Sequence, residues 1–269
     1  MEFKFIDEKT THPLIDHFYQ LKISKSDLPF KTLIVPPVQT TVTYVFCDDY
    51  QLSERGKNKI LYRDLTLTGI MFGVYYVSIT NESENLGFSL RPTALYKILG
   101  KDISSYNNSH INFKEIDKDL NDKLCTLFKK YRTNIDVFVR EIYNLLDKYP
   151  LTENKFTKFV DNATNYIKKK DGLLSVNDLL EVVPLSQKSL ESHFKKIIGI
   201  TPGKYIRQHR FLTLMKKYQS KKIELSDLIH QFNYYDASHF GRDFKLFMGQ
   251  TPRQYFQKDY PLIKKYLIE

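Results

Sequence analysis

The chain repeats one pattern of fourteen residues, and the second copy begins fifty residues after the first. HFKKIIGITPGKYI covers residues 193–206, and DFKLFMGQTPRQYF covers residues 243–256. Six positions carry the same residue in both copies: Phe194/Phe244, Lys195/Lys245, Gly199/Gly249, Thr201/Thr251, Pro202/Pro252 and Tyr205/Tyr255. Glycine suits the left-handed residue that ends a helix, and Thr-Pro suits the cap and first position of the next helix. The repeat therefore predicts one tight helix–helix corner, built twice.

A short amphipathic segment precedes each copy. Residues 175–183 (SVNDLLEVV) and 225–232 (LSDLIHQF) each predict a short helix. A turn of about three residues follows, and Ser186 or Asp236 then caps a longer helix. A short helix, a short turn and a longer helix with a polar outer face form the helix-turn-helix pattern. We predict two such units, at about residues 175–206 and 225–256.

The longer helix of each unit has one apolar face. In the first unit the residues expected to point inward are Leu190, Phe194 and Ile197, and in the second Phe240, Phe244 and Phe247. Residues 202–218 predict one continuous helix between the units. Two recognition helices on a rigid connector can enter successive major grooves of DNA, which lie about 34 Å apart. The repeat therefore predicts that one chain reads a bipartite DNA site.

The net charge of +10 is concentrated in the second half of the chain. Residues 151–269 contain 21 Lys and Arg against 12 Asp and Glu, whereas residues 1–150 contain 20 against 19. An excess of positive charge suits a polyanionic partner, either nucleic acid or an anionic membrane surface. A basic surface that only increases solubility is the alternative.

Residues from about 158 to 257 resemble the DNA-binding domain of AraC/XylS-type bacterial transcription regulators. The hallmarks are SLESHFKKIIGITPGKYIRQHR and DASHFGRDFKLFMGQTPRQYF. The chain departs from the family pattern at two turn glycines, replaced by Pro184 and Asn233, and near two alanine positions, where Leu180 and Ile229 stand. Asn tolerates a left-handed turn and Pro does not, so we expect the first turn to have a different shape.

The resemblance implies a sequence-specific DNA-binding transcription regulator with double-stranded DNA as its partner. Activation is the commoner outcome in this family, and RNA polymerase is then a candidate partner. DNA contact is implied for the outward positions of both second helices: Lys188, Ser189, Glu191, Ser192 and Lys195 in the first, and Ala237, Ser238, Gly241, Arg242 and Lys245 in the second.

Among these positions, Arg242 is the best candidate for reading a base, because Arg can bind guanine O6 and N7 with two bonds. Glu191 could accept from cytosine N4, although phosphate would repel it. The other basic candidates are expected to contact phosphates: Lys195, Lys245, Lys204 and Arg207. A solvated helix face is the alternative for each Lys. Arg207 and Arg210 could instead form structural ion pairs.

The first hundred residues predict mainly strands, with period-two alternation at residues 42–47, a β-rich run at residues 70–79 and a short helix capped by Thr93. Two amphipathic helices follow between residues 119 and 146, which either pack on the strands or pair in a homodimer. The expected fold class is α+β. It comprises a small β-barrel, cupin-like domain with appended helices (residues 1–150) and an all-α DNA-binding domain (residues 151–269).

GFSLRPTALYKILG resembles the N-terminal domain that precedes this DNA-binding domain in a subset of the family. The resemblance implies a domain that senses a small-molecule effector or mediates dimerisation. Arg91 could hold an anionic effector. An Arg at a strand-to-helix turn more often pairs with a nearby carboxylate, and we favour that reading.

Two alternatives remain besides a regulator. An architectural DNA-binding protein, or a protein with a basic face for a membrane surface, would show no sequence preference. A DNA alkyl-acceptor protein would use Cys47 or Cys125 as nucleophile, but two aspartates follow Cys47 and would raise its pKa. The seven histidines form no HxxxH or HxH pair and the cysteines no CxxC. We therefore expect no enzyme activity, metal or cofactor. Because no signal peptide or apolar span is evident, we expect a cytoplasmic location.

Overall fold

The computed structural model describes residues 1–6, 12–35, 37–47, 50–54, 60–61, 63–220 and 223–268. Its N-terminal part contains two antiparallel sheets. The six-stranded sheet runs in the order β1 (Glu2–Ile6), β2 (Ile15–Ile23), β9 (Ser83–Leu90), β4 (Thr41–Val45), β7 (Asp64–Thr68), β10 (His110–Asn112). The four-stranded sheet runs in the order β3 (Phe30–Ile34), β8 (Tyr75–Ile79), β5 (Gln51–Glu54), β6 (Ile60–Leu61).

The two sheets face each other across an apolar core. Phe3 and Leu21 of the first sheet share a buried cluster with Leu52 and Val77 of the second. The expectation of a strand over residues 70–79 was wrong in its first half, because strand β8 begins only at Tyr75. The preceding residues leave the sheet and contact the helical part instead.

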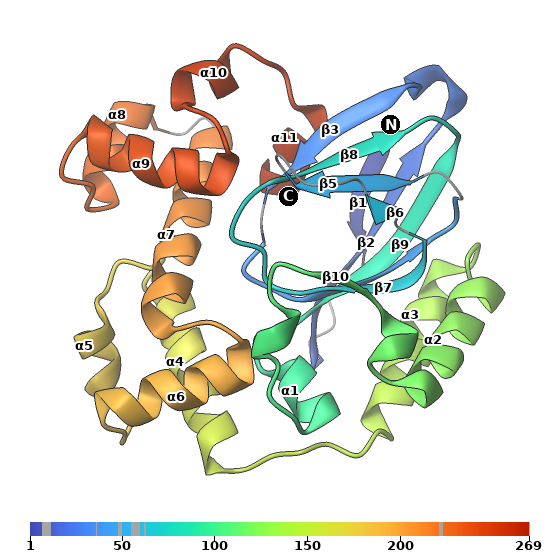
Figure 1. Ribbon diagram of the computed structural model, residues 1–269, viewed down its shortest axis with the longest axis horizontal. Helices are drawn as coiled ribbons and strands as arrows, with labels where there is room; N and C mark the ends of the chain where they lie inside the picture. Colours follow the sequence, from blue (N-terminus) through green and yellow to red (C-terminus); the bar gives the residue numbers. More distant parts are fainter. Residues whose placement is uncertain are drawn as a thin grey trace.

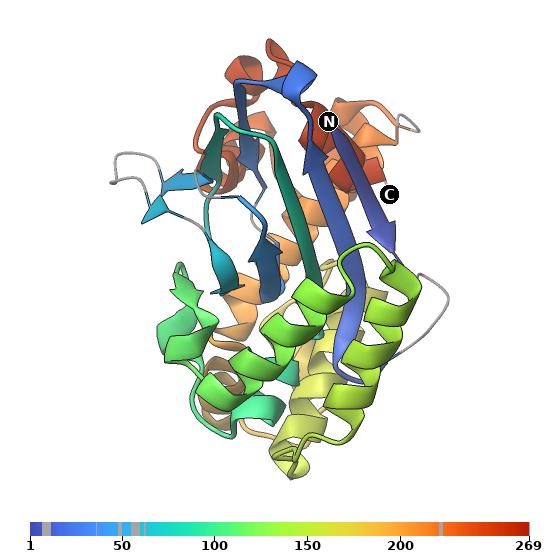
Figure 2. The same ribbon diagram turned by 90° about the vertical axis from the view of Figure 1, so that its right-hand side faces the viewer.

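Among the described residues of the N-terminal part, one helix lies between β9 and β10 and two follow β10; short 3₁₀ turns lie at Lys25–Asp27, Ser104–Tyr106 and Phe113–Glu115. The helices are α1 (Ala94–Leu99), α2 (Lys118–Lys130) and α3 (Ile135–Asp147). The ring of Phe128 lies 6.2 Å from that of Phe88, and the ring of Phe138 lies 5.8 Å from that of Phe18. Helices α2 and α3, green in Figure 2, therefore pack on the strands.

The C-terminal part is helical. Its helices are α4 (Lys155–Lys169), α5 (Val176–Leu180), α6 (Gln187–Ile198), α7 (Pro202–Gln219), α8 (Leu225–Gln231), α9 (Ala237–Met248), α10 (Pro252–Phe256) and α11 (Pro261–Ile268). Figure 1 shows α5 and α6 at one end of α7, and α8 and α9 at the other. Both predicted corners are present, with Gly199 at φ 97° and Gly249 at φ 66°. The predicted α+β fold, with strands first and helices after, is confirmed.

Hydrophobic clusters cross between the two parts. One contains Leu95 and Ile103 together with Ile198 and Tyr205, and another joins Val74 to the helices around α7. Helix α11 returns to the strands, where Leu262 joins the cluster of Phe3. The two parts therefore share their apolar cores.

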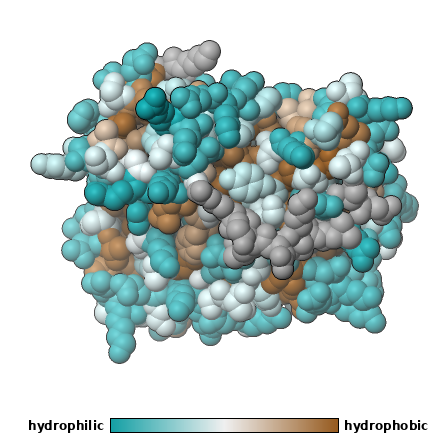
Figure 3. Space-filling model, turned by 45° about the horizontal axis from the view of Figure 1, so that its top comes forward, coloured by the Kyte–Doolittle hydropathy of each residue, from teal (hydrophilic) through white to brown (hydrophobic). Residues whose placement is uncertain are grey.

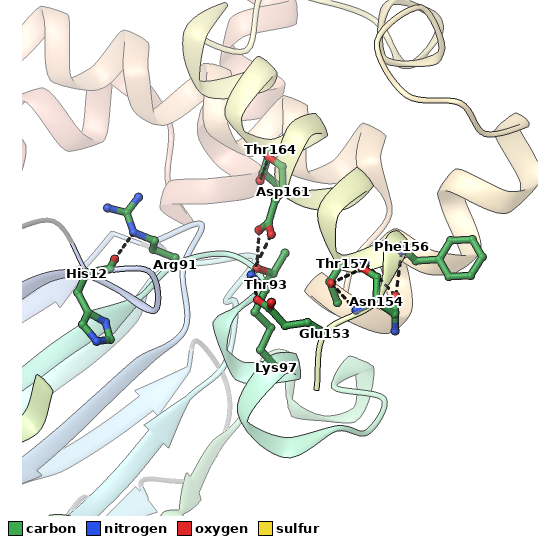
Figure 4. Close-up of polar contacts among 10 residues, drawn as sticks. All are labelled: His12, Arg91, Thr93, Lys97, Glu153, Asn154, Phe156, Thr157, Asp161 and Thr164. Carbon is green, nitrogen blue, oxygen red and sulfur yellow. Dashed lines mark hydrogen bonds and ion pairs between the residues drawn. The ribbon is translucent and has the colours of Figure 1, made fainter. Parts of the chain in front are cut away.

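A polar network adds to this contact (Figure 4). Lys97 of α1 lies 2.9 Å from the Glu153 carboxylate and 3.0 Å from that of Asp161. Burial by itself would lower the pKa of Lys97, but the two carboxylates outweigh it and raise the pKa. Thr93, expected to cap α1, makes no cap bond and donates to Asp161 at 2.5 Å instead.

Candidate nucleic-acid interface

Helices α6 and α9 present the faces that the sequence predicts. The three apolar positions expected to point inward are buried in each helix: Leu190, Phe194 and Ile197 in α6, and Phe240, Phe244 and Phe247 in α9. The Ser186 hydroxyl accepts from the Ser189 backbone N–H at 3.3 Å, and the Asp236 carboxylate accepts from that of His239 at 2.6 Å. The second helix of each unit therefore begins at its predicted cap.

The candidate DNA-contacting positions lie on the opposite faces. Seven of them are exposed: Lys188, Ser192, Lys195, Ala237, Ser238, Arg242 and Lys245. Ser189, Glu191 and Gly241 are half-buried at the edges of the faces. Within the described part of the chain, no carboxylate forms an ion pair with Lys188, Lys195, Arg242 or Lys245. These four cations are therefore available to a polyanion.

The alternative structural role of Arg207 and Arg210 is the one that the structure supports. Asp243 of α9 is 0 % exposed. Its carboxylate accepts from Arg207 Nε at 2.8 Å and from the Tyr234 hydroxyl at 3.0 Å, and Arg210 Nη2 lies 3.8 Å away. The bond to Asp243 raises the pKa of Arg207. This buried carboxylate fastens the second unit to the connector α7.

The two turns differ as the sequence predicts. Asn233 of the second turn adopts φ 57°, the left-handed conformation usually supplied by glycine. In the first turn, residues 181–186 contain no positive-φ residue, in keeping with Pro184. The first unit therefore connects its helices by a different backbone path.

Residues 179–258 match the family model described as a helix-turn-helix domain. These residues therefore form a helix-turn-helix domain. The HTH-type transcriptional activator AarP of Providencia stuartii is 27 % identical to the chain over 86 residues, which are 32 % of this chain and 64 % of AarP. The chain thus spans about 64 % of the length of this relative.

Solved structures of ToxT from Vibrio cholerae share the fold. The complex of ToxT with (E)-4-(8-methylnaphthalen-1-yl)but-3-enoic acid superposes with a TM-score of 0.50 at 10 % identity, covering 89 % of this chain and 98 % of that chain. A second ToxT structure gives a TM-score of 0.48 at 11 % identity, covering 89 % and 96 %. The superposition with the complex covers 89 % of this chain, so it includes residues of both the N-terminal strands and the C-terminal helices.

Two candidate residues of the helix-turn-helix domain have partners within the chain. The amide of Gln187 donates to the Glu191 carboxylate at 2.9 Å, so Glu191 is already held by a residue one turn before it. Lys204 Nζ lies 5.1 Å from the centre of the Phe72 ring in the N-terminal part. The sequence analysis did not name Gln187, although its spacing of four residues from Glu191 places both side chains on one helix face.

Tyr235 is a second residue that the sequence analysis missed. Hydrophilic side chains cover most of the face shown in Figure 3. Of the described residues, five large hydrophobic ones are exposed, and Tyr235, at 89 %, is the most exposed of them. It directly precedes the Asp236 cap of α9. An aromatic residue just before a recognition-helix cap is the signal that could have marked it.

The described residues give little support to cysteine or metal chemistry. Burial raises the pKa of the Cys125 thiol, which disfavours the thiolate needed for nucleophilic attack. Cys47 is half-buried, and the aspartates after it lie outside the described residues. Among the described residues, no group of three His, Cys, Asp or Glu side chains could hold a metal ion. None of the described helices could cross a membrane.

Proposed function

We propose that this chain is a sequence-specific DNA-binding transcription regulator of the AraC/XylS type, which reads a bipartite site through α6 and α9. The observation that carries the proposal is the pair of helix-turn-helix units on one uninterrupted connector, each with an exposed polar face. Helix α7 has 18 residues, a length of about 27 Å at 1.5 Å per residue. This length is of the order of the separation of about 34 Å between successive major grooves.

The proposed roles of the exposed residues follow from their chemistry. Arg242 would read guanine with two hydrogen bonds, because its guanidinium is exposed and no carboxylate of the described residues pairs with it. Lys188, Lys195 and Lys245 would bind phosphates and so set the register of each unit. The small side chains Ala237 and Ser238 would let the start of α9 approach the base edges. Arg207, although exposed, would act indirectly, by holding α9 through Asp243.

Selection from random DNA duplexes with the chain of residues 1–269 tests this proposal. We expect enrichment of two short boxes about one helical turn apart. Binding without enrichment would leave the architectural alternative. A chain that binds no duplex at all would rule out the proposed function.

We further propose that residues 1–150 sense an anionic effector in a cleft shared with the DNA-binding part, residues 151–269. The cleft has a volume of about 430 Å³. Its charged lining residues are Asp16, Arg91, Lys168, Asp171 and Lys216, and its walls include Phe5, Val38, Leu212 and Tyr266. It therefore combines apolar walls with an excess of cations.

Two cations of the cleft are the candidates for holding an anion. From the sequence we favoured a carboxylate partner for Arg91, but in the structure Arg91 contacts a backbone carbonyl instead. Its Nε donates to the His12 backbone carbonyl at 2.7 Å, and its two other guanidinium nitrogens point away from that carbonyl (Figure 4). Burial, together with nearby Lys168, lowers the pKa of Lys216 although Asp16 opposes the shift. A bound anion would favour the charged form of Lys216.

The acid bound to ToxT supplies a probe for the effector proposal. We expect calorimetry to detect binding of (E)-4-(8-methylnaphthalen-1-yl)but-3-enoic acid, and Lys216→Ala to weaken it about tenfold through loss of a charged contact. Lys158→Ala, an exposed lysine of α4 outside the cleft, is the control. Equal affinity of the Lys216 variant and the control would contradict this site.

Three further expectations belong to the same proposal. Activation through contact with RNA polymerase would appear as increased run-off transcription from a promoter that carries the selected site. A homodimer would appear in sedimentation as twice the mass of the chain. A DNA-binding regulator of bacterial type would act in the cytoplasm, where the chromosome lies.

A further inference from the structure

Two loops of the N-terminal part contact the C-terminal ends of both recognition helices. We name residues 69–74 and 103–108 the docking loops. The backbone N–H of Ile103 donates to the Lys196 carbonyl at 3.1 Å, and the Asn107 side-chain amide donates to the Gly199 carbonyl. The Val74 N–H donates to the Phe247 carbonyl at 3.1 Å. Carbonyls in the last turn of a helix lack hydrogen-bond donors within the helix, and the docking loops supply such donors in both units.

The repeated glycines permit this approach. A Cβ on Gly199 would lie 2.7 Å from the Asn107 amide atoms, and one on Gly249 would lie 3.2 Å from a Val74 methyl. Each glycine therefore serves the left-handed corner and also makes room for a docking loop. The corner therefore recurs at the two sites where a docking loop touches a recognition helix.

The docking loops are joined to each other. The Asn108 N–H donates to the Ile70 carbonyl at 3.0 Å, and the Phe72 N–H donates to the Asn108 side chain at 2.8 Å. A Cβ on Gly69 would lie 1.9 Å from the Tyr106 carbonyl oxygen, so the backbones pass in direct contact. Hydrogen bonds and direct backbone contact therefore join the two loops into one structural element.

The connector docks on the same element. Gln208 of α7 is fully buried, and its amide donates to the Met71 carbonyl at 2.8 Å and to the Pro37 carbonyl at 3.2 Å. Both recognition helices and the helix between them thus rest on one part of the N-terminal structure. In Figure 1, α6 and α9 both run from the outer side of α7 toward the strands.

We propose that the docking loops act as a clamp that fixes the separation and orientation of α6 and α9, and so determines which spacing of two DNA boxes the chain accepts. Asn107 is a positioning residue in this clamp, because it donates to both the Ser104 and Gly199 carbonyls. The consequence for DNA rests on the proposed function. The geometry of the clamp itself does not.

An isosteric variant tests the clamp without DNA. Asn107→Asp replaces the donor amide with a carboxylate that faces the Gly199 carbonyl oxygen. Asn144→Asp, the same change on α3 away from the loops, is the control. Spin labels on cysteines introduced at Ser192 and Ser238, with Cys47 and Cys125 replaced by Ser, report the distance between α6 and α9 by pulsed electron resonance.

We expect one narrow distance distribution in the parent chain and in the control, and a broader or displaced one in the Asn107 variant. An unchanged distribution in a folded Asn107→Asp protein would overturn the clamp. If that variant does not fold, Gln208→Ala provides the same test at the connector.

The second readout is discrimination between the selected site and the same site with one added base pair between its boxes. We expect Asn107→Asp to reduce the ratio of the two dissociation constants about fivefold, as the loss of one part-buried hydrogen bond would. A ratio equal to that of the control would contradict the spacing role. A parent chain that binds no DNA would refute the proposed function, and the distance measurement would still decide the clamp.

Discussion

The two helix-turn-helix units build the same corner and core, yet fasten to the rest of the molecule differently. At the matching position of the repeat, the first unit has His193 and the second has Asp243. The His193 ring stacks on Phe156 with 3.6 Å between ring centres, whereas the buried Asp243 carboxylate holds Arg207 and Tyr234. One fold is therefore held by ring stacking in one copy and by a buried charge network in the other.

The cores should be equally sensitive in both copies. Phe194→Ala and Phe244→Ala each remove a fully buried ring, and each should cost about 3–5 kcal/mol of the free energy of unfolding. Urea denaturation of the two variants measures this directly. A cost below about 1 kcal/mol in either one would show that its face assignment is wrong.

The second-largest effect on stability is expected at the matching position, which Asp243 and His193 occupy. Asp243→Ala leaves two arginines without their buried partner, and the 46 % exposure of the Arg207 side chain screens part of the loss. We expect a cost of about 2–4 kcal/mol. His193→Ala should cost about 1 kcal/mol, the value of one aromatic contact. Equal costs in thermal denaturation would contradict the contrast between the two units.

The recognition faces should differ in how they affect DNA. Arg242→Ala should cost about 1–3 kcal/mol on the selected site and relax the preference at one base position. Lys188→Ala should weaken binding to all sequences alike and lower the salt slope by about 1. Titrations on the selected duplex and on single-base variants at several salt concentrations separate the two effects. A uniform loss for Arg242→Ala would reduce it to a phosphate contact.

His209 of the connector α7 gives the stability of the chain a pH dependence. Burial lowers the pKa of His209 to about 4; nearby Asp171 opposes this shift, whereas Lys168 and Lys216 add to it. The unfolded chain takes up a proton near pH 6.5 and the folded chain only near pH 4, so stability falls as the pH decreases through this window. Because His209 is partly exposed, we expect a loss of about 1–2 kcal/mol. His209→Gln should flatten the dependence in urea titrations at pH 7 and 4.5.

The smallest effect concerns the turns. Asn233→Ala places an alanine at φ 57° and should cost about 1 kcal/mol, whereas Asn233→Gly should be close to neutral. Glu181→Ala in the first turn is the matched control, because Glu181 has an ordinary right-handed conformation. Equal losses at Asn233 and Glu181 in thermal denaturation would show that the left-handed conformation contributes nothing.

The sequence predicted the parts of the fold that depend on local chemistry. Gly199, Gly249 and Asp236 determine their own surroundings through backbone conformation or a cap bond three residues away. The faces of α6 and α9 follow from apolar spacing within one helix. The two corners, the connector helix and the exposed candidate residues could therefore be predicted from the sequence alone.

The sequence could not predict contacts between distant segments. Nothing in the spacing of Asn107 and Gly199, or of Val74 and Phe247, indicates that each pair meets. Residues 70–74 read as strand because they are apolar, but the helical part offers them partners that the sheet does not. Thr93 likewise does not cap α1, because its hydroxyl donates to Asp161, which lies 68 residues later in the chain.

The central claim is that both units read one DNA molecule together at a fixed spacing. The most direct measurement compares two affinities of the chain of residues 1–269. One is its affinity for the selected two-box duplex, and the other is its affinity for the same duplex after insertion of about five base pairs, half a helical turn, between the boxes. Our account predicts that affinity falls to that of a duplex with one box, because the insertion turns the second box to the opposite side of the helix. Unchanged affinity would contradict it.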